Sequence, residues 1–421
     1  MKPDVIVIGA GLAGLCCARR LQEHGLAPLV LEGSNGVGGR VRTDRVDGFL
    51  LDRGFQVLLT AYPTARATLD YTALDLRPFH PGALVRWGER FHRVADPWRH
   101  PLEAFGTVFG EVGSLADKLR VAALRRHVLR GSLREIFQRP ERTTIAALRE
   151  MGFSDSMVER FFRPFLAGVL LDPRLETSSH MFEFVFRMFA SGDVVLPAWG
   201  MGAIPQQLAA GLPAEAVRTG AAVATLAADG VRLQSGECLS AGAVVVATDG
   251  SEAGRLLGGQ WARGWNATTC VYFAADTSPV DEPILVLNGE GSGPVSNLCV
   301  PSVVAPSYAP AGAALIAVNI PGDVREHESA LVDAVRDQLA GWFGAGVNRW
   351  RHLRTYRIPH AQPGQAPPVL AQLERPVRVR DNLYACGDHL DTSSIEGAMR
   401  SGQRAADAVA YDLERSATRS G

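Results

Sequence analysis

Close to its N-terminus the chain runs Val5-Ile6-Val7-Ile8-Gly9-Ala10-Gly11-Leu12-Ala13-Gly14. The β-branched run that opens this stretch has no polar break, which predicts a parallel strand buried on both faces. Residues 15–24 are helical in composition, and a second short strand is expected over residues 28–31, ending on Glu32. Strand, GxGxxG turn, helix, strand and acidic residue form the fingerprint of a dinucleotide-binding unit.

Each residue of this fingerprint has a physical task. Gly9 makes the tight turn, Gly11 lets a pyrophosphate approach the backbone, and Gly14 lets the helix pack closely on the strand. The pyrophosphate is expected at the helix N-terminus, where unpaired N–H groups favour an anion. Glu32 is placed to accept hydrogen bonds from a ribose diol.

A second glycine-rich stretch follows Glu32 after only two residues. In it, Gly38 and Gly39 let backbone amides approach a ligand, and Arg40 supplies a cation for a second pyrophosphate contact. With Thr43 after them, these residues resemble the glycine-glycine motif of the flavin amine oxidase, phytoene desaturase and protoporphyrinogen oxidase superfamily. That resemblance implies that the glycine pair lies beside FAD.

The other end of the chain carries a matching motif. A short strand runs into Gly387 and Asp388, and Ser393 or Ser394 can cap a helix that begins near Ile395. The free N–H groups of that helix are expected to face negative charge on a reduced flavin, and Asp388 to accept hydrogen bonds from ribityl hydroxyls. The stretch is similar to the C-terminal flavin motif of the same superfamily.

The middle of the chain adds two further segments to the expected flavin site. Residues 222–234 have the composition of a β-hairpin, and the resemblance implies that Val223 binds adenine through its backbone. The segment 47–56 resembles the one that passes the isoalloxazine ring, with Gly54 allowing close approach. Together the cofactor-binding candidates are Gly9, Gly11, Gly14, Glu32, Gly38, Gly39, Arg40, Gly54, Val223, Gly387, Asp388, Ile395, Gly397 and Ala398.

The expected fold is α/β, with a Rossmann-like FAD-binding domain of the GR2 type and an inserted α+β substrate-binding domain. Two flavin motifs at opposite ends indicate that the FAD-binding domain is assembled from both: residues 1–70, 196–255 and 355–421. Residues 71–195 and 256–354 are expected to form the substrate-binding domain. The length of 421 residues suits more than one core.

The substrate region offers two patterns. Residues 160–169 and 197–205 resemble the phytoene desaturase branch of the superfamily. A cluster of large apolar residues is expected mainly in the core, although an apolar tunnel would draw on the same side chains. These residues are Phe182, Phe184, Phe186, Met188 and Phe189.

A basic helix is expected over residues 115–137, with six basic and two acidic residues. Leu115 and Leu119 share one face of it, and Leu124 and Val128 lie opposite. The pattern favours a helix packed into the domain and leaves open a patch that contacts a membrane surface. Six scattered cysteines without a CxxC pair favour a reducing compartment, so the protein is expected in the cytoplasm, alone or in peripheral contact with a membrane.

Charge and composition exclude several classes of protein. The 43 basic and 44 acidic residues give a net charge of −1, so no basic field exists to bind nucleic acid. Only Lys2 and Lys118 are lysines, whereas many flavin amine oxidases hold a water against the flavin with a lysine. No CxxC pair is present, and the HExxH pattern that His327 begins is incomplete, so no metal site is expected.

The resemblance implies an enzyme that transfers hydride from a C–H bond of an apolar, carotenoid- or isoprenoid-like substrate to FAD. Oxygen or a quinone would then take the electrons. Flavin amine oxidation and protoporphyrinogen oxidation are the enzymatic alternatives, and a prenyl-binding protein like the GDP-dissociation inhibitors is the non-enzymatic one. No catalytic base stands out, with Gln56 and His389 the weak candidates. FAD is expected without a covalent link. In the amine oxidases that carry such a link, the cysteine lies well upstream of the Gly-Asp motif, and here no cysteine lies between Cys299 and Cys386.

Overall fold

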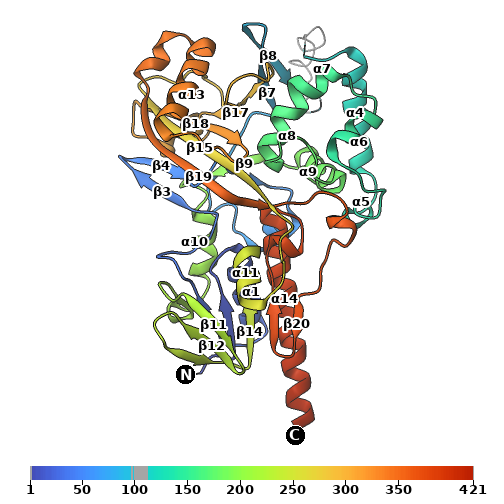
Figure 1. The fold of residues 1–421 in the computed structure, drawn as a ribbon, viewed down its shortest axis with the longest axis vertical. Helices are drawn as coiled ribbons and strands as arrows, with labels where there is room; N and C mark the ends of the chain where they lie inside the picture. Colours follow the sequence, from blue (N-terminus) through green and yellow to red (C-terminus); the bar gives the residue numbers. More distant parts are fainter. Residues whose placement is uncertain (1, 96–97, 99–111, 421) are drawn as a thin grey trace.

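A computed structural model describes residues 2–95, 98 and 112–420. The described chain is elongated, with a parallel sheet and its helices at one end and a larger mixed sheet with a group of helices at the other (Figure 1). The long strands β15 (Trp265–Ala275) and β19 (Arg351–Pro363) run from the larger sheet toward the parallel one. The two parts therefore meet at the start of β15 and at the end of β19.

The parallel sheet collects strands from both ends and the middle of the chain. Its strands in spatial order are β10 (Val217–Arg218), β2 (Pro28–Leu31), β1 (Val5–Ile8), β14 (Ala243–Val246), β21 (Leu383–Ala385) and β20 (Arg378–Arg380). The first five are parallel to their neighbours and β20 is antiparallel. The predicted strands over residues 5–8 and 28–31 are confirmed, and the α/β fold class with them.

Two helices from opposite chain ends pack on each other beside this sheet. Helix α1 (Leu12–Glu23) begins three residues earlier than predicted, and α14 (Ile395–Ser420) lies along it. Their contact is close, because a Cβ added at Gly402 would lie 2.1 Å from the carbonyl oxygen of Ala13. The hairpin predicted in the middle of the chain is confirmed and carries a third strand. These strands are β11 (Val223–Ala227), β12 (Gly230–Leu233) and β13 (Cys238–Ser240).

The larger sheet is mainly antiparallel. Its strands in spatial order are β19, β15, β18 (Ala314–Pro321), β17 (Asn297–Cys299), β16 (Leu285–Asn288), β7 (Gly82–Trp87) and β8 (Arg90–Ala95). On one face, Val271 and Phe273 of β15 pack with helix α13 (Glu328–Phe343) in a core of their own. The alternate residues Cys270 and Tyr272 belong to the main core on the other face.

The helical group covers that second face. Its members are α4 (Leu115–Leu129), α5 (Leu133–Ile136), α6 (Thr144–Glu150), α7 (Asp155–Met157), the π-helical turn η1 (Val158–Phe162), α8 (Arg163–Leu170) and α9 (Ser179–Ser191). Shorter elements connect the parts: β3 (Thr43–Val46), β4 (Phe49–Asp52), β5 (Leu58–Leu59), α2 (Pro63–Thr68), β6 (Leu76–Pro78), β9 (Val194–Pro197), α10 (Ala203–Ala210), α11 (Gly250–Leu257) and α12 (Pro301–Val304).

The single helix predicted over residues 115–137 is wrong. The chain breaks at Gly131, whose φ of +70° is left-handed, and α4 and α5 lie on either side. Helix α4 buries Leu124 and Val128, while Leu115 and Leu119 are 61% and 66% exposed. None of the helices in the described ranges is both long and apolar enough to cross a membrane.

Candidate functional site

A cavity of about 1130 Å³ lies between the parallel sheet, the larger sheet and the helical group. This exceeds the roughly 300–1,000 Å³ of an ordinary ligand pocket, so it has room for a large ligand and a second molecule. One part, the glycine-lined half, is formed at the carboxyl ends of β1, β14 and β21. The other part, the aromatic half, is enclosed by α8, α9 and the larger sheet.

The glycines of the first turn differ in their surroundings, because one packs against backbone and another faces open space. A Cβ added at Gly14 would lie 1.9 Å from the carbonyl oxygen of Gly9, which has a φ of +106°. At Gly11, by contrast, an added Cβ would meet nothing within 4 Å, and no side chain caps the N-terminus of α1. The orphan N–H groups of that helix therefore face open space at the cavity, as a pyrophosphate requires.

The second glycine loop lies directly against the first. The N–H of Gly38 donates to the carbonyl oxygen of Ala10 at 2.8 Å, and Gly39, with a φ of +58°, sits against Gly11. Glu32 lines the cavity, and its carboxylate accepts hydrogen bonds from the N–H groups of Ala10 and Ser34, each at 2.8 Å. The two glycine motifs thus form one cradle with an oriented carboxylate at its edge.

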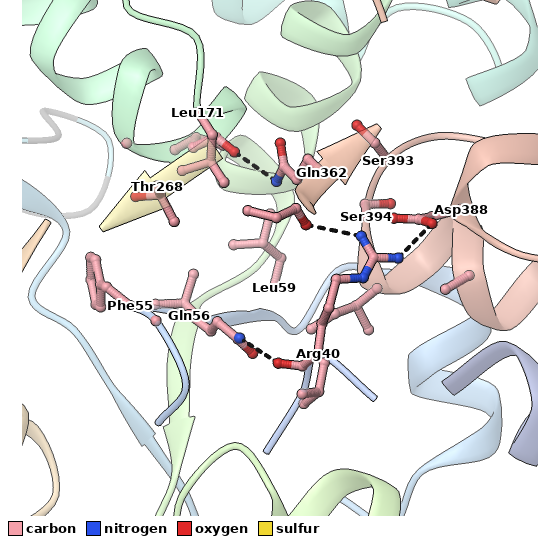
Figure 2. A pocket seen from close by; sticks show the side chains of 18 of the residues that line it. Arg40, Phe55, Gln56, Leu59, Leu171, Thr268, Gln362, Asp388, Ser393 and Ser394 are labelled. Carbon is pink, nitrogen blue, oxygen red and sulfur yellow. Dashed lines mark hydrogen bonds and ion pairs between the residues drawn. The ribbon is translucent and has the colours of Figure 1, made fainter. Parts of the chain in front are cut away.

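Arg40 joins the two ends of the chain across the cavity (Figure 2). Its guanidinium donates to Asp388 Oδ1 at 2.7 Å and to the carbonyl oxygen of Ala361 at 2.9 Å. Asp388 is 5% exposed. Burial works against the charge on Arg40, but Asp388 outweighs it and raises the pKa of the guanidinium. The residue expected to meet a pyrophosphate is therefore held in an ion pair with the other end of the chain.

The start of α14 is organised as predicted. Ser394 caps the helix by accepting the N–H of Gly397 at 3.0 Å, and Ile395 and Ala398 line the cavity. Gly397 itself does not line it. A Cβ there would lie 2.0 Å from the carbonyl oxygen of Thr392, so this glycine permits the turn into the helix.

The remaining cofactor candidates also reach the cavity. Val223 and Gly387 line it from β11 and from the turn after β21. Gly54, with a φ of +95°, lines it beside β19, where an added Cβ would lie 2.7 Å from Ile358 Cδ1. Of all the cofactor candidates, only Gly14 and Gly397 are not among the residues that line the cavity.

The two weak catalytic candidates are placed differently. Gln56 lines the cavity and donates through Nε2 to the carbonyl oxygens of Arg40 and Arg53, at 2.9 and 3.0 Å. Its Oε1 is buried and has no hydrogen-bond partner among the described residues. His389 is 3% exposed, packs edge-on against Trp261 and does not line the cavity. Burial lowers the pKa of His389, which keeps the ring neutral.

Phenylalanines dominate the aromatic half. They are Phe55, Phe79, Phe161, Phe162, Phe165, Phe186 and Phe189. The cluster predicted mainly in the core is divided: Phe182, Phe184 and Met188 are buried away from the cavity, whereas Phe186 and Phe189 line it. Helix α9 produces this division because its successive residues point to different faces.

Several polar residues of the cavity carry no sequence motif. Thr268 on β15 donates to Asn319 Oδ1 at 2.7 Å, and Gln362 at the end of β19 donates to the carbonyl oxygen of Val169 at 3.1 Å. Asp44 and Arg354 line the cavity as well. Alternation along β19 is the only signal that could have identified Arg354. The described lining contains no lysine and no cysteine, and the described residues hold no group of three or more potential metal ligands.

The comparison with protein families gives one match over most of the chain. Residues 12–410 match the family described as flavin containing amine oxidoreductase. This match begins inside the first glycine motif, after Gly9 and Gly11, and covers the second glycine motif, the aromatic half and the start of α14.

Curated relatives match over short segments. A candidate flavin-containing monoamine oxidase of Mycobacterium tuberculosis is 53% identical over 86 residues, which are 20% of this chain and 19% of that protein. Putrescine oxidase of Kocuria rosea is 36% identical over 100 residues, 24% of this chain and 20% of that enzyme. The chain thus spans about a fifth of the length of these relatives.

Solved structures match along nearly the whole chain. Cyclohexylamine oxidase from Brevibacterium oxydans has a TM-score of 0.71 at 19% identity, covering 98% of this chain and 100% of that one. A candidate protoporphyrinogen oxidase from Exiguobacterium has a TM-score of 0.70 at 16% identity, covering 98% and 99%. At such identities these matches establish a shared fold, a Rossmann-type FAD-binding domain with a substrate-binding domain.

Proposed function

Because the chain belongs to the family of flavin-containing amine oxidoreductases, we propose that it is an FAD-dependent enzyme that removes hydride from a C–H bond of an apolar substrate. The cofactor of the family is FAD held without a covalent link, and the glycine cradle at Gly11 fits its pyrophosphate. Bound FAD supplies the hydride acceptor. The observation that carries the choice of substrate is the phenylalanine-rich lining of the aromatic half.

The residues of the glycine-lined half bind and orient. The N-terminus of α1 would hold the pyrophosphate, and Glu32 would accept hydrogen bonds from ribose hydroxyls. Gln56 presents an unpartnered acceptor, Oε1, that can receive a hydrogen bond from a ring N–H. The phenylalanines of the aromatic half exclude water and position the C–H bond that reacts.

The charged groups of the aromatic half disfavour a protonated amine. Among the described carboxylates that line the cavity, Asp44 is the one in contact with Tyr356 of the larger sheet, and it is already paired with Arg53 at 2.9 Å and hydrogen-bonded by Tyr356 at 2.8 Å. Lys118 lies on α4 and is not among the lining residues, so the cavity lacks the lysine that many amine oxidases use. A polyene or other isoprenoid therefore suits the site better than an amine. Flavin amine oxidation and protoporphyrinogen oxidation remain the alternatives, and oxygen or a quinone would reoxidise the enzyme.

Two measurements test this proposal. The purified protein should be yellow and should release FAD on heating without proteolysis, because the cofactor is not covalently bound. Under anaerobic conditions, a panel of polyenes, porphyrinogens and amines is then added to the holoenzyme and the flavin absorbance is followed. Rapid bleaching by polyenes is expected. Bleaching by primary or secondary amines alone would contradict the proposed substrate class, and a colourless protein would favour a non-enzymatic prenyl-binding role.

A further inference from the structure

The face of β19 that lines the cavity changes from apolar to charged along its length. Arg354, Tyr356 and Ile358 alternate on that face, as residues two apart do in a strand, and all three line the cavity. Gln362, at the end near Arg40, lines it too. Arg354 pairs with Tyr272 of β15 and Gln362 pairs with Asn266, so the two positions are six residues apart along β15 (272 − 266 = 6), which corresponds to roughly 20 Å at the usual rise of a strand.

Arg53 and Arg354 both lie near the carboxylate of Asp44, at the Arg354 end of the cavity. Asp44 accepts hydrogen bonds from Arg53, with Nε 3.1 Å and the nearer terminal nitrogen 2.9 Å away, and from the hydroxyl of Tyr356 at 2.8 Å. Burial alone would raise the pKa of Asp44, but these partners lower it, so the carboxylate stays ionised. The nearest nitrogen of Arg354 is 3.7 Å from Asp44, longer than a hydrogen bond.

Within this group the charge that remains is therefore on Arg354, whereas the guanidinium of Arg357, which also lines the cavity, donates to the carbonyl oxygens of Val324 and Glu326. The formal charges of Arg53, Arg354 and Asp44 sum to +1. The Arg354 side chain is 47% exposed, and its guanidinium lies 5.8 Å from the centre of the Tyr356 ring, so it is placed against the wall of the cavity. A guanidinium is a planar fork of N–H donors that matches the oxygens of a carboxylate or a phosphate.

We propose that Arg354, supported by Arg53, binds an acidic head group of the substrate, a carboxylate or phosphate, while the apolar chain runs along β19 toward Gln362. The inference rests on the proposed function, because it assumes an apolar substrate in the aromatic half. It adds that this substrate is an anionic amphiphile and that its head group lies far from the reacting carbon.

Four ligands with the same chain test the head group. Oleic acid, oleyl phosphate, oleyl alcohol and oleylamine are titrated into the holoenzyme below their aggregation limits, and binding is followed by the shift in flavin absorbance. A charge-assisted hydrogen bond predicts that the acid or the phosphate binds about tenfold more tightly than the alcohol. The better of the two anions identifies the head group, and oleylamine is expected to bind most weakly.

Variants on the same strand locate the effect. Arg354→Gln should bring the dissociation constant of the preferred anion to that of the alcohol, and Arg354→Glu should make oleylamine the tightest ligand. Binding of the alcohol, unchanged in both variants, shows that the cavity is intact. The matched control is Arg351→Gln, since Arg351 lies on the same strand but pairs with Asp47 at 2.7 Å and does not line the cavity.

The outcomes separate this inference from the proposed function. Equal affinity for anions and alcohol in the unmodified protein, or an anion preference that survives in Arg354→Gln, would overturn the head-group site and leave the apolar substrate standing. If none of the four ligands binds while amines reduce the flavin, the proposed function fails and the head-group site with it.

Discussion

Gly11 and Gly14 belong to one sequence motif but have different surroundings. Open space surrounds the position of a Cβ at Gly11, whereas a Cβ at Gly14 would overlap the backbone of Gly9. We therefore propose that the first glycine is required by the ligand, whereas the second is required by the contact between helix and strand. This difference agrees with the separate tasks that the motif predicts for the two residues, which are close approach of a pyrophosphate at Gly11 and close packing of helix on strand at Gly14.

Alanine substitutions should separate these roles. Gly11→Ala, at a helix N-terminus with an ordinary φ of −73°, should change the stability of the apoprotein by less than about 1 kcal/mol while lowering FAD affinity tenfold or more. Gly14→Ala should destabilise the protein by roughly 3 kcal/mol or more, because backbone must move. Flavin content and thermal unfolding of the apoproteins measure both. Equal loss of stability in the two variants would contradict the division.

For single residues, the sequence predicts roles that depend on neighbouring residues well, and it predicts partners far apart in the chain poorly. The turn at Gly9 and the cap at Ser394 depend on neighbours within a few residues, so their patterns suffice. The partner of Arg40, Asp388, lies 348 residues away, and no spacing rule joins them. The same holds for Thr268 and Arg354, which the fold brings to the cavity from strands without motifs.

Asp52 connects four elements from the end of β4. Its carboxylate accepts hydrogen bonds from the Thr43 hydroxyl at the start of β3, the N–H of Met201 before α10 at 2.9 Å and the Tyr308 hydroxyl of the 3-10 helix η3 (Pro306–Tyr308) at 2.8 Å. Its carbonyl oxygen accepts the hydroxyl of Tyr272 on β15. Burial raises the pKa of Asp52 to about 6, although the three hydrogen bonds to its carboxylate lower it.

A raised pKa makes this junction sensitive to pH. The folded protein favours protonated Asp52, so its stabilising contribution is complete below the ordinary value of 3.8 and is lost as the pH rises through about 6. Relative to Asp52→Asn, the unmodified protein should lose roughly 2 kcal/mol of unfolding free energy between about pH 4 and about pH 7. Denaturant unfolding measures this difference.

The comparison with Asp52→Asn also removes other pH effects, because groups elsewhere titrate in both proteins. The amide oxygen of asparagine can still accept hydrogen bonds from the Thr43 hydroxyl and the Met201 N–H. Its NH₂ group can donate to the Tyr308 hydroxyl, which then accepts a hydrogen bond and no longer donates one. The matched control is Asp47→Asn on the neighbouring turn, where the side chain is 60% exposed. If both variants followed the same pH profile, Asp52 would not be the titrating group.

Boundaries of elements were predicted less well than their existence. The prediction of one helix over residues 115–137 overlooked two N-terminal capping boxes. One is formed by Ser114 and Asp117, and the other by Ser132 and Glu135. Gly131 between them takes the left-handed conformation that ends a helix. The packed face of α4 could not be chosen from periodicity, because Leu115 and Leu124 lie on opposing apolar faces and only the fold decides which is covered.

The whole molecule is organised around a cavity that no single segment encloses. Its lining comes from the first forty residues, from the middle strands and from the start of α14. Sequence motifs predicted this assembly from both ends, and the order of the parallel sheet agrees with it, since β1 and β21 flank β14. The aromatic half could not be predicted in the same way, because an apolar residue in a core and one in a cavity leave the same pattern.

A ligand held by segments this far apart should stabilise the whole fold. FAD binding to the folded protein alone adds about 2.7 kcal/mol at a free concentration one hundredfold above its dissociation constant. The melting temperature of the apoprotein should therefore rise with the logarithm of added FAD. FMN and AMP added together provide the control, because they carry the same groups without the pyrophosphate link. If the cradle at Gly11 binds that link, FAD should raise the melting temperature more than the two halves do. An equal rise with the unlinked halves would mean that the glycine-lined half binds the ends of FAD and leaves its pyrophosphate without a role in stability.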